Sequence, residues 1–152
     1  MKVAIGSDHA GFPLKQRVKA ELERLGHQVL DMGTQSTESV DYPDYAIPVA
    51  EAVADGRADR GVVLCATGIG ASIAANKVDG VRASVVTSDE TARLTRTDND
   101  SNVLALGGKS NPDFDVVLGW LRTWLDTPFA GGRHERRVGK IRTYEAQHHA
   151  RT

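Results

Sequence analysis

A single cysteine in front of a glycine-flanked turn is the strongest candidate for chemistry in the sequence. Cys65 ends the apolar run G-V-V-L-C (61–65) and is followed by A-T-G-I-G (66–70). The pattern predicts a buried strand that turns directly into a helix. A thiol at the start of a helix favours the thiolate, which is the reactive form. A cysteine that only packs in the core explains the same position, so this segment alone leaves both interpretations open.

The two glycines of the turn indicate an anion site. Gly68 and Gly70 let the backbone approach a ligand closely, with amide N–H groups pointing outward. The segment lacks the lysine of a phosphate-binding P-loop and the full glycine spacing of a dinucleotide fingerprint. The turn therefore predicts an anion site in outline only.

Two further polar segments flank predicted strands. S-D-H-A-G (7–11) places Asp8 beside His9 after the strand predicted at 2–6, and T-D-N-D-S-N (97–102) precedes the last predicted strand. Asp8 has a simpler interpretation as a cap for the following helix. Ligands of parallel sheets bind at the carboxyl ends of strands, so we expect both segments and the cysteine turn to meet there.

A basic segment, G-G-R-H-E-R-R-V-G-K-I-R (131–142), lies near the end of the chain. At helical spacing Arg133, Arg137 and Lys140 share one face, and Val138, Ile141 and Tyr144 share another. Two arginines one turn apart suit a phosphate, although a solvated face is the usual meaning of such a run. The apolar stripe predicts that the helix, residues 133–147, docks on a surface, and a second copy of the chain is a candidate for that surface.

Short β-branched runs alternate with longer segments of helical period. We therefore predict an α/β fold: a three-layer, Rossmann-like, doubly wound sheet of about five parallel strands with helices on both faces, forming one domain over residues 1–152. The predicted strands are 2–6, 27–33, 61–65, 82–87 and 102–107, and the predicted helices are 13–25, 46–56, 71–78, 91–96, 116–125 and 133–147.

The composition excludes several classes of protein. The 152 residues carry a formal net charge of -1, which gives no reason to expect nucleic acid or an anionic membrane as a partner. One cysteine rules out an internal disulfide and argues against a cysteine-based zinc site. No signal peptide and no apolar run of about 20 residues is present, so we expect a cytoplasmic protein.

Four segments together resemble one family. S-D-H-A-G, C-A-T-G-I-G-A-S-I-A-A-N-K-V, N-D-S-N-V-L-A-L-G and G-G-R-H-E-R-R-V-G-K-I occur in order, and the chain resembles the type B ribose 5-phosphate isomerases from about residue 2 to about 142. Galactose 6-phosphate isomerase subunits belong to the same superfamily. The resemblance implies an aldose–ketose isomerase without metal or cofactor. It also implies a homodimer with sites built from both subunits, and leaves open whether dimers pair into tetramers.

The resemblance also implies roles for individual residues. Cys65 would be the base that moves a proton between C1 and C2 through an enediolate, and Thr67 would assist transfer between the two oxygens. The backbone amides around Gly68 and Gly70, with Asn99, would hold the enediolate oxygens. Asp8 would bind substrate hydroxyls, and the phosphate would be held by His9, Arg133 and Arg137.

This chain departs from the family pattern at three positions. Asp98 stands where most members have the histidine that helps to open the furanose ring, Lys109 replaces a phosphate-binding arginine, and Ala66 replaces a glycine. Asp98 itself or His9 could open the ring. Alternatively the substrate could be a tetrose 4-phosphate, erythrose or erythrulose 4-phosphate, which cannot close such a ring.

We therefore expect isomerisation of ribose 5-phosphate to ribulose 5-phosphate, with the tetrose phosphate as the alternative. A non-catalytic phosphosugar-binding module and an inactive subunit of a hetero-oligomer are the remaining alternatives. The combination of Cys65, Thr67 and Asn99 argues against both, because a passive binder has no reason to combine them.

Overall fold

A five-stranded parallel sheet forms the centre of the molecule, and its order is β2-β1-β3-β5-β4. The computed structural model describes residues 1–111 and 113–149. The predicted α/β fold is confirmed, although the strand expected at 82–87 is reduced to three residues. The strands are β1 (Lys2–Ser7), β2 (Gln28–Asp31), β3 (Arg60–Cys65), β4 (Ala83–Val85) and β5 (Val103–Gly107).

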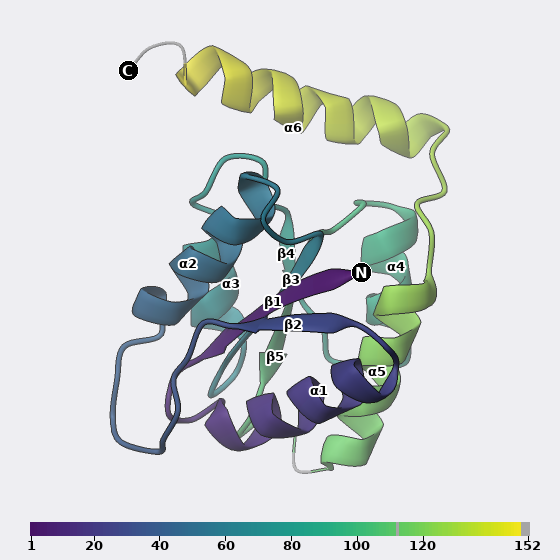
Figure 1. Ribbon diagram of the computed structural model, residues 1–152. Coiled ribbons are helices and arrows are strands. Elements are labelled where there is room, and N and C mark those ends of the chain that lie inside the picture. Colours follow the sequence, from purple (N-terminus) through teal and green to yellow (C-terminus); the bar gives the residue numbers. More distant parts are fainter. Residues whose placement is uncertain (112, 150–152) are drawn as a thin grey trace.

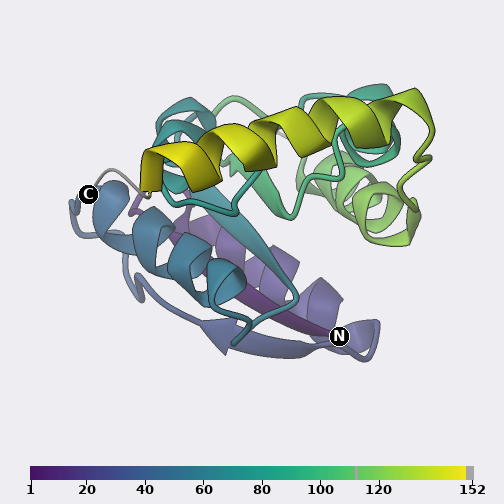
Figure 2. The same ribbon diagram turned by 90° about the horizontal axis from the view of Figure 1, so that it is seen from above.

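Helices cover both faces of the sheet, as expected for a doubly wound fold (Figure 1). One face carries α1 (Phe12–Arg24), α4 (Asp89–Thr97) and α5 (Phe114–Asp126), and the other carries α2 (Pro43–Ala54) and α3 (Ile69–Ala75). The last helix, α6 (Arg133–His149), lies outside these layers and crosses one end of the molecule (Figure 2).

The strand that leads to the cysteine is buried on both faces, and its side chains alternate between two cores. Val62 and Leu64 pack with the residues of α1 and α5, whereas Val63 and Cys65 pack with those of α2 and α3. The alternation therefore places the thiol of Cys65 on the face of the sheet that α2 and α3 cover.

The connections change direction at one point of the sheet. The chain passes from β1 outward to β2 through α1, and then returns to β3 on the other side of β1 through α2. The carboxyl ends of β1 and β3 are thus the topological switch point at which ligands of such sheets bind. Asp8 and His9 follow β1 there, and the turn after Cys65 follows β3.

Candidate active site

The thiol of Cys65 lies at the carboxyl end of β3 and is 4% exposed. The backbone N–H of Gly68 donates to its Sγ at 3.2 Å. Hydrogen bonds to a charged partner are stronger than those to a neutral one. The Gly68 N–H would therefore bind a thiolate more strongly than a neutral thiol. Thr67, two residues on, is exposed beside it, and its hydroxyl accepts the N–H of Ile69 at 3.2 Å.

The turn depends on glycine at position 68. Gly68 has φ +83°, in the left-handed region, and a Cβ there would lie 3.0 Å from the carbonyl carbon of Leu106. Residues with a side chain rarely adopt this conformation. The left-handed turn is what directs the N–H back toward the sulfur.

The loop after β5 lies directly against the cysteine turn. Gly108 N–H donates to the carbonyl of Cys65 at 2.8 Å, and Lys109 N–H donates to the carbonyl of Ala66 at 2.9 Å. The turn accommodates the Cβ of Ala66, which is half-buried. Lys109 is exposed, so its ammonium group lies at the same edge of the sheet as the thiol.

Asp8 and His9 join this group from β1. Asp8 is 6% exposed, and its Oδ1 accepts the N–H of Gly11 at 2.9 Å, which closes the turn before α1. Gly11 is the N-cap of α1, and no described side chain caps that helix, so the expected capping by Asp8 is wrong. His9 Nδ1 lies 3.2 Å from the backbone nitrogen of Val40. The carboxyl edge therefore combines a thiol, a carboxylate, an imidazole and an ammonium group.

The segment 97–102 lies at the opposite edge of the sheet, and the expectation that it meets the cysteine turn is wrong. It precedes β5, whose Val103 pairs with Gly61 near the start of β3. Cys65 stands four residues further along β3, or about 13 Å at 3.3 Å per residue. In a parallel sheet, the loop before a strand lies at the amino edge. Within one chain, Asp98 and Asn99 are therefore remote from the thiol.

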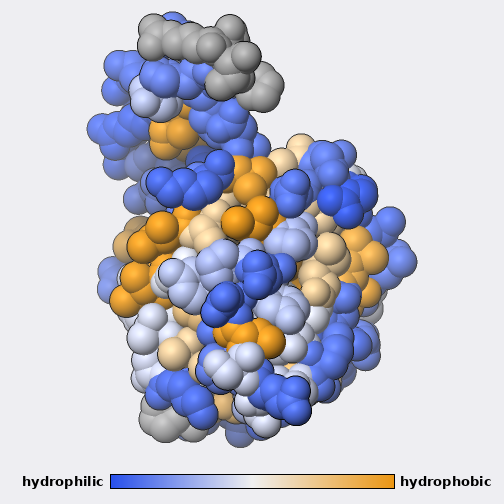
Figure 3. Space-filling model, turned by 90° about the vertical axis from the view of Figure 1, so that its left-hand side faces the viewer, coloured by the Kyte–Doolittle hydropathy of each residue, from blue (hydrophilic) through white to orange (hydrophobic). Residues whose placement is uncertain are grey.

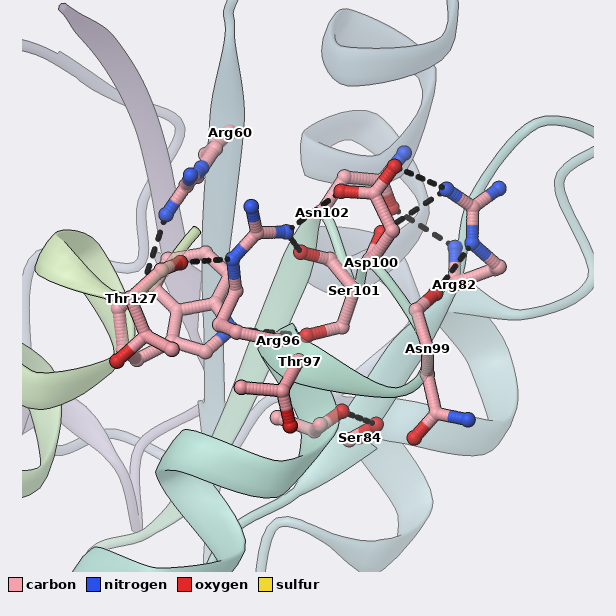
Figure 4. A network of polar contacts seen from close by, with 12 residues as sticks. Arg60, Arg82, Ser84, Arg96, Thr97, Asn99, Asp100, Ser101, Asn102 and Thr127 are labelled. Carbon is pink, nitrogen blue, oxygen red and sulfur yellow. Dashed lines mark hydrogen bonds and ion pairs between the residues drawn. The ribbon is translucent and has the colours of Figure 1, made fainter. Parts of the chain in front are cut away.

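Arginines fix the segment at this amino edge (Figure 4). Asp100 has φ +49°, and its carboxylate accepts Arg96 Nη1 at 2.9 Å and lies 3.5 Å from Arg82 Nη2. Arg82 Nε also donates to the carbonyl of Asn99 at 2.9 Å. The Asn99 side chain is exposed and points away from this network, which leaves its amide available to a ligand.

A further arginine ties this edge to α5. Arg60 Nη1 donates to the carbonyls of Trp124 and Leu125 at 3.0 and 3.3 Å, and its guanidinium lies 5.0 Å over the Trp124 ring. Burial, followed by the nearby charge of Arg96, lowers the pKa of Arg60 to about 10. Burial and then the charge of Arg142 likewise lower the pKa of Arg82. The amino edge is thus dense in positive charge.

The basic helix α6 begins at the same edge. Arg142 of this helix lies 3.8 Å from Asp100, and Val138 is buried. Arg133 and Arg137 are exposed and form no ion pair with another described residue, so both are available to an anion. Between them, His134 Nε2 lies 3.5 Å from Asp98 Oδ1, a contact that the sequence analysis missed.

The predicted site residues thus form two groups at opposite edges of the sheet. Within residues 1–111 and 113–149, no cluster of three or more His, Cys, Asp or Glu side chains could hold a metal ion. Nor does that part of the chain contain a helix long and apolar enough to cross a membrane. The carboxyl-edge group is Asp8, His9, Cys65, Ala66, Thr67, Gly68, Gly70 and Lys109; the amino-edge group is Asp98, Asn99, Arg133 and Arg137.

Comparison with known proteins identifies the family. The family model described as Ribose/Galactose Isomerase matches residues 3–141. Ribose-5-phosphate isomerase B of Escherichia coli is 45% identical over 95% of this chain and 96% of its own length. The chain belongs to the ribose/galactose isomerase family, as the four motifs predicted.

Solved structures agree with this assignment. Ribose-5-phosphate isomerase B of Clostridium thermocellum has a TM-score of 0.94 and 51% identity, covering 97% of this chain and 99% of that one. The enzyme of the same name from Mycoplasma genitalium, solved with bound ribulose-5-phosphate, has a TM-score of 0.91 and 37% identity, covering 95% and 96%. The particular relatives that this chain resembles are therefore ribose-5-phosphate isomerases of type B.

Proposed function

We propose that the protein interconverts ribose 5-phosphate and ribulose 5-phosphate. The observation that carries this proposal is the buried thiol of Cys65 with the Gly68 N–H donating to it, in a chain whose relatives include an enzyme solved with ribulose-5-phosphate. A reduced thiol is required, which fits a reducing compartment such as the cytoplasm.

In the proposed reaction, the Cys65 thiolate removes the proton from C2 of the open-chain aldose. The electron pair moves toward the carbonyl to give an enediolate, and the thiol then returns a proton to C1. Thr67 passes a proton between O1 and O2. The backbone amide of Gly70 and the side chain of Asn99 bind the developing oxyanion, whereas the Gly68 N–H donates to the sulfur. Fixed oxyanion donors of this kind are worth about 3 to 4 kcal/mol each.

The phosphate of the substrate calls for positive charge away from the thiol. We assign it to His9, Lys109, Arg133 and Arg137, because the two arginines are exposed and unpaired among the described residues. Arg133 and Arg137 lie one turn apart, so both guanidinium groups can reach one phosphate. Asp8 would accept hydrogen bonds from sugar hydroxyls. Binding the remote phosphate would supply energy for positioning the reacting carbons.

A homodimer would bring the two groups of residues together. In one chain they lie at opposite edges of the sheet, so a complete site needs the carboxyl edge of one copy and the amino edge of another. Apolar side chains gather on the face of the body beneath α6 (Figure 3). Four of the exposed apolar residues lie on the elements that a dimer would use: Ile69 and Ile73 on α3, and Ile141 and Tyr144 on α6.

Turnover of ribose 5-phosphate, measured beside erythrose 4-phosphate, tests the proposed function. We expect the pentose phosphate to be turned over and Cys65→Ala to abolish turnover while sugar-phosphate binding persists. Preferential turnover of the tetrose would contradict the substrate assignment. Unchanged activity in Cys65→Ala would contradict the role of the thiol, and binding without any turnover in the unmodified chain would identify a binding module.

A further inference from the structure

His134 and Asp98 form a pair that joins two segments at the amino edge of the sheet. His134 Nε2 lies 3.5 Å from Asp98 Oδ1, and the histidine side chain is 14% exposed, whereas the carboxylate is 40% exposed. Asp98 Oδ1 also accepts the hydroxyl of Thr97 at 2.9 Å. The carboxylate is thereby held between the end of α4 and the start of α6.

The backbone explains why these two side chains meet. Ala130 N–H donates to the carbonyl of Thr97 at 3.1 Å, and Arg96 Nε donates to the carbonyl of Thr127 at 3.0 Å. These contacts tie the segment before α6 to the end of α4. Two glycines with positive φ, Gly131 and Gly132, then turn the chain into the helix. The backbone contacts between these two segments therefore hold His134 and Asp98 next to each other.

The proposed reaction requires a proton transfer that the thiol does not supply. Ribose 5-phosphate has a free 4-hydroxyl group and exists mostly as a furanose. To expose the aldehyde, the anomeric hydroxyl O1 must lose a proton, the C1–O4 bond must break, and O4 must gain a proton. A group that can both accept and donate a proton near neutral pH suits this exchange, and imidazole is the side chain with that property.

Resting on the proposed function, we propose that His134 opens the furanose ring and that Asp98 positions it. His134 Nδ1 takes the proton from O1, the O1 electron pair forms the C1=O1 bond, the C1–O4 bond breaks, and the imidazolium returns the proton to O4. Asp98 orients the ring through Nε2 and stabilises the transient imidazolium, as a carboxylate does for a histidine in a catalytic triad.

The alternatives explain the geometry less well. His9 Nδ1 lies 3.2 Å from the backbone nitrogen of Val40, and His9 lies at the carboxyl edge, where it is assigned to the phosphate. Asp98 Oδ1 already accepts the hydroxyl of Thr97 and faces Nε2 of His134, contacts that suit a positioning residue. His134 instead lies between two residues assigned to phosphate, Arg133 and Arg137, at the edge that carries Asn99.

A single-turnover experiment with enzyme in excess over sugar separates ring opening from isomerisation. Ribulose 5-phosphate cannot form a furanose because its 5-hydroxyl is esterified, so only the aldose direction needs ring opening. The variants are His134→Asn, Asp98→Asn, and the double variant Asp98→His with His134→Asn. The matched control is His148→Asn, which removes an exposed histidine from the same helix. Circular dichroism confirms that each variant is folded.

In the unmodified chain and in His148→Asn, we expect one phase of ribose 5-phosphate consumption whose rate rises with enzyme concentration. In His134→Asn we expect a small fast phase from the open-chain sugar. The main phase then runs at the spontaneous ring-opening rate, independent of enzyme concentration. Asp98→Asn should weaken the enzyme-dependent phase, and the double variant should restore it. Consumption of ribulose 5-phosphate should stay in one fast phase throughout.

Two results would overturn this assignment of His134. One is a His134→Asn variant that behaves like His148→Asn in both directions. The other is a variant slowed equally in both directions with rates that still rise with enzyme concentration, which would make His134 a binding or structural residue. Absence of turnover in the unmodified chain, in either direction, would instead contradict the proposed isomerase function.

Discussion

At the scale of the residue, the site depends on where single backbone groups point. The Gly68 N–H reaches Cys65 Sγ because the residue is left-handed, and the tight contact with Leu106 leaves no room for a side chain. A turn of this kind places its donor without relying on any flexible side chain. The chemistry of the thiol is therefore sensitive to a change that adds one methyl group.

Gly68→Ala tests this dependence. We expect a loss in the free energy of unfolding greater than the about 1 to 2 kcal/mol of a left-handed backbone alone, because the added Cβ also meets the backbone of Leu106, and a fall in kcat because the N–H moves away from the sulfur. Gly26→Ala is the matched control: Gly26 has φ +89°, and a Cβ added there would meet no atom within 4 Å. It should lose only the about 1 to 2 kcal/mol of the left-handed backbone and keep its kcat. Equal kcat values in the two variants would refute the role of the Gly68 amide.

At the scale of the element, a buried ion pair joins α1 to the end of β2. Lys15 is fully buried, and its Nζ donates to Asp31 Oδ1 at 2.7 Å. Burial by itself would raise the pKa of Asp31. The hydrogen bonds from Lys15 and from the N–H of Gly33, with the charge of Lys15, outweigh burial and lower it. This pair therefore stabilises the folded chain above the ordinary aspartate pKa of about 4.

Asp31→Asn should destabilise the fold by about 3 to 5 kcal/mol at pH 7, because it leaves the buried ammonium group without its partner. The free energy of unfolding of the unmodified chain should fall as the pH drops below about 4, because there the unfolded chain protonates Asp31 while the folded chain, with its lowered pKa, still keeps it ionised; this dependence should be shallower in the variant. Chemical denaturation between pH 3 and pH 7 measures both. Asp55→Asn, in an exposed pair with Arg57 that water screens, should leave the free energy of unfolding nearly unchanged; an equal loss in both variants would contradict the role assigned to the buried pair.

Periodicity in the sequence predicted every strand and helix of the described chain, because buried strands and amphipathic helices carry that signal locally. It placed the segment 97–102 at the carboxyl edge of the sheet. The segment precedes β5, and in a parallel sheet the loop before a strand lies at the amino edge. Periodicity also missed His134 as a partner of Asp98. That contact is set by the hydrogen bonds of residues 127–130 to α4, which are tertiary and leave no pattern in the sequence.

At the scale of the whole molecule, the carboxyl and amino edges of the sheet carry different parts of the proposed site. A substitution at one edge should therefore damage only the part of the site that lies at that edge, and leave the part at the other edge intact. A Cys65→Ala copy keeps an intact amino edge, and an Arg137→Ala copy keeps an intact carboxyl edge. A mixed dimer of the two would contain one site with both native edges.

We expect the two inactive variants to recover activity when they are mixed and allowed to exchange subunits. Recovery should approach about a quarter of the unmodified activity, because half of the dimers are mixed and each mixed dimer has one complete site. The matched mixture joins Cys65→Ala with Thr67→Ala, whose defects lie at the same edge, and should stay inactive. Activity in neither mixture, with subunit exchange confirmed by mass spectrometry, would place the whole site within one chain.

The opposed positions of Cys65 and Arg137 have a thermodynamic consequence for assembly. In the proposed dimer, a sugar phosphate held by one edge of each copy would act as a bridge, so the ligand would tighten the association of the subunits by the same factor as association would tighten the binding of the ligand. Dissociation of the dimer on dilution should then be opposed by a competitive inhibitor. The melting temperature of the complex would depend on the concentrations of protein and ligand together.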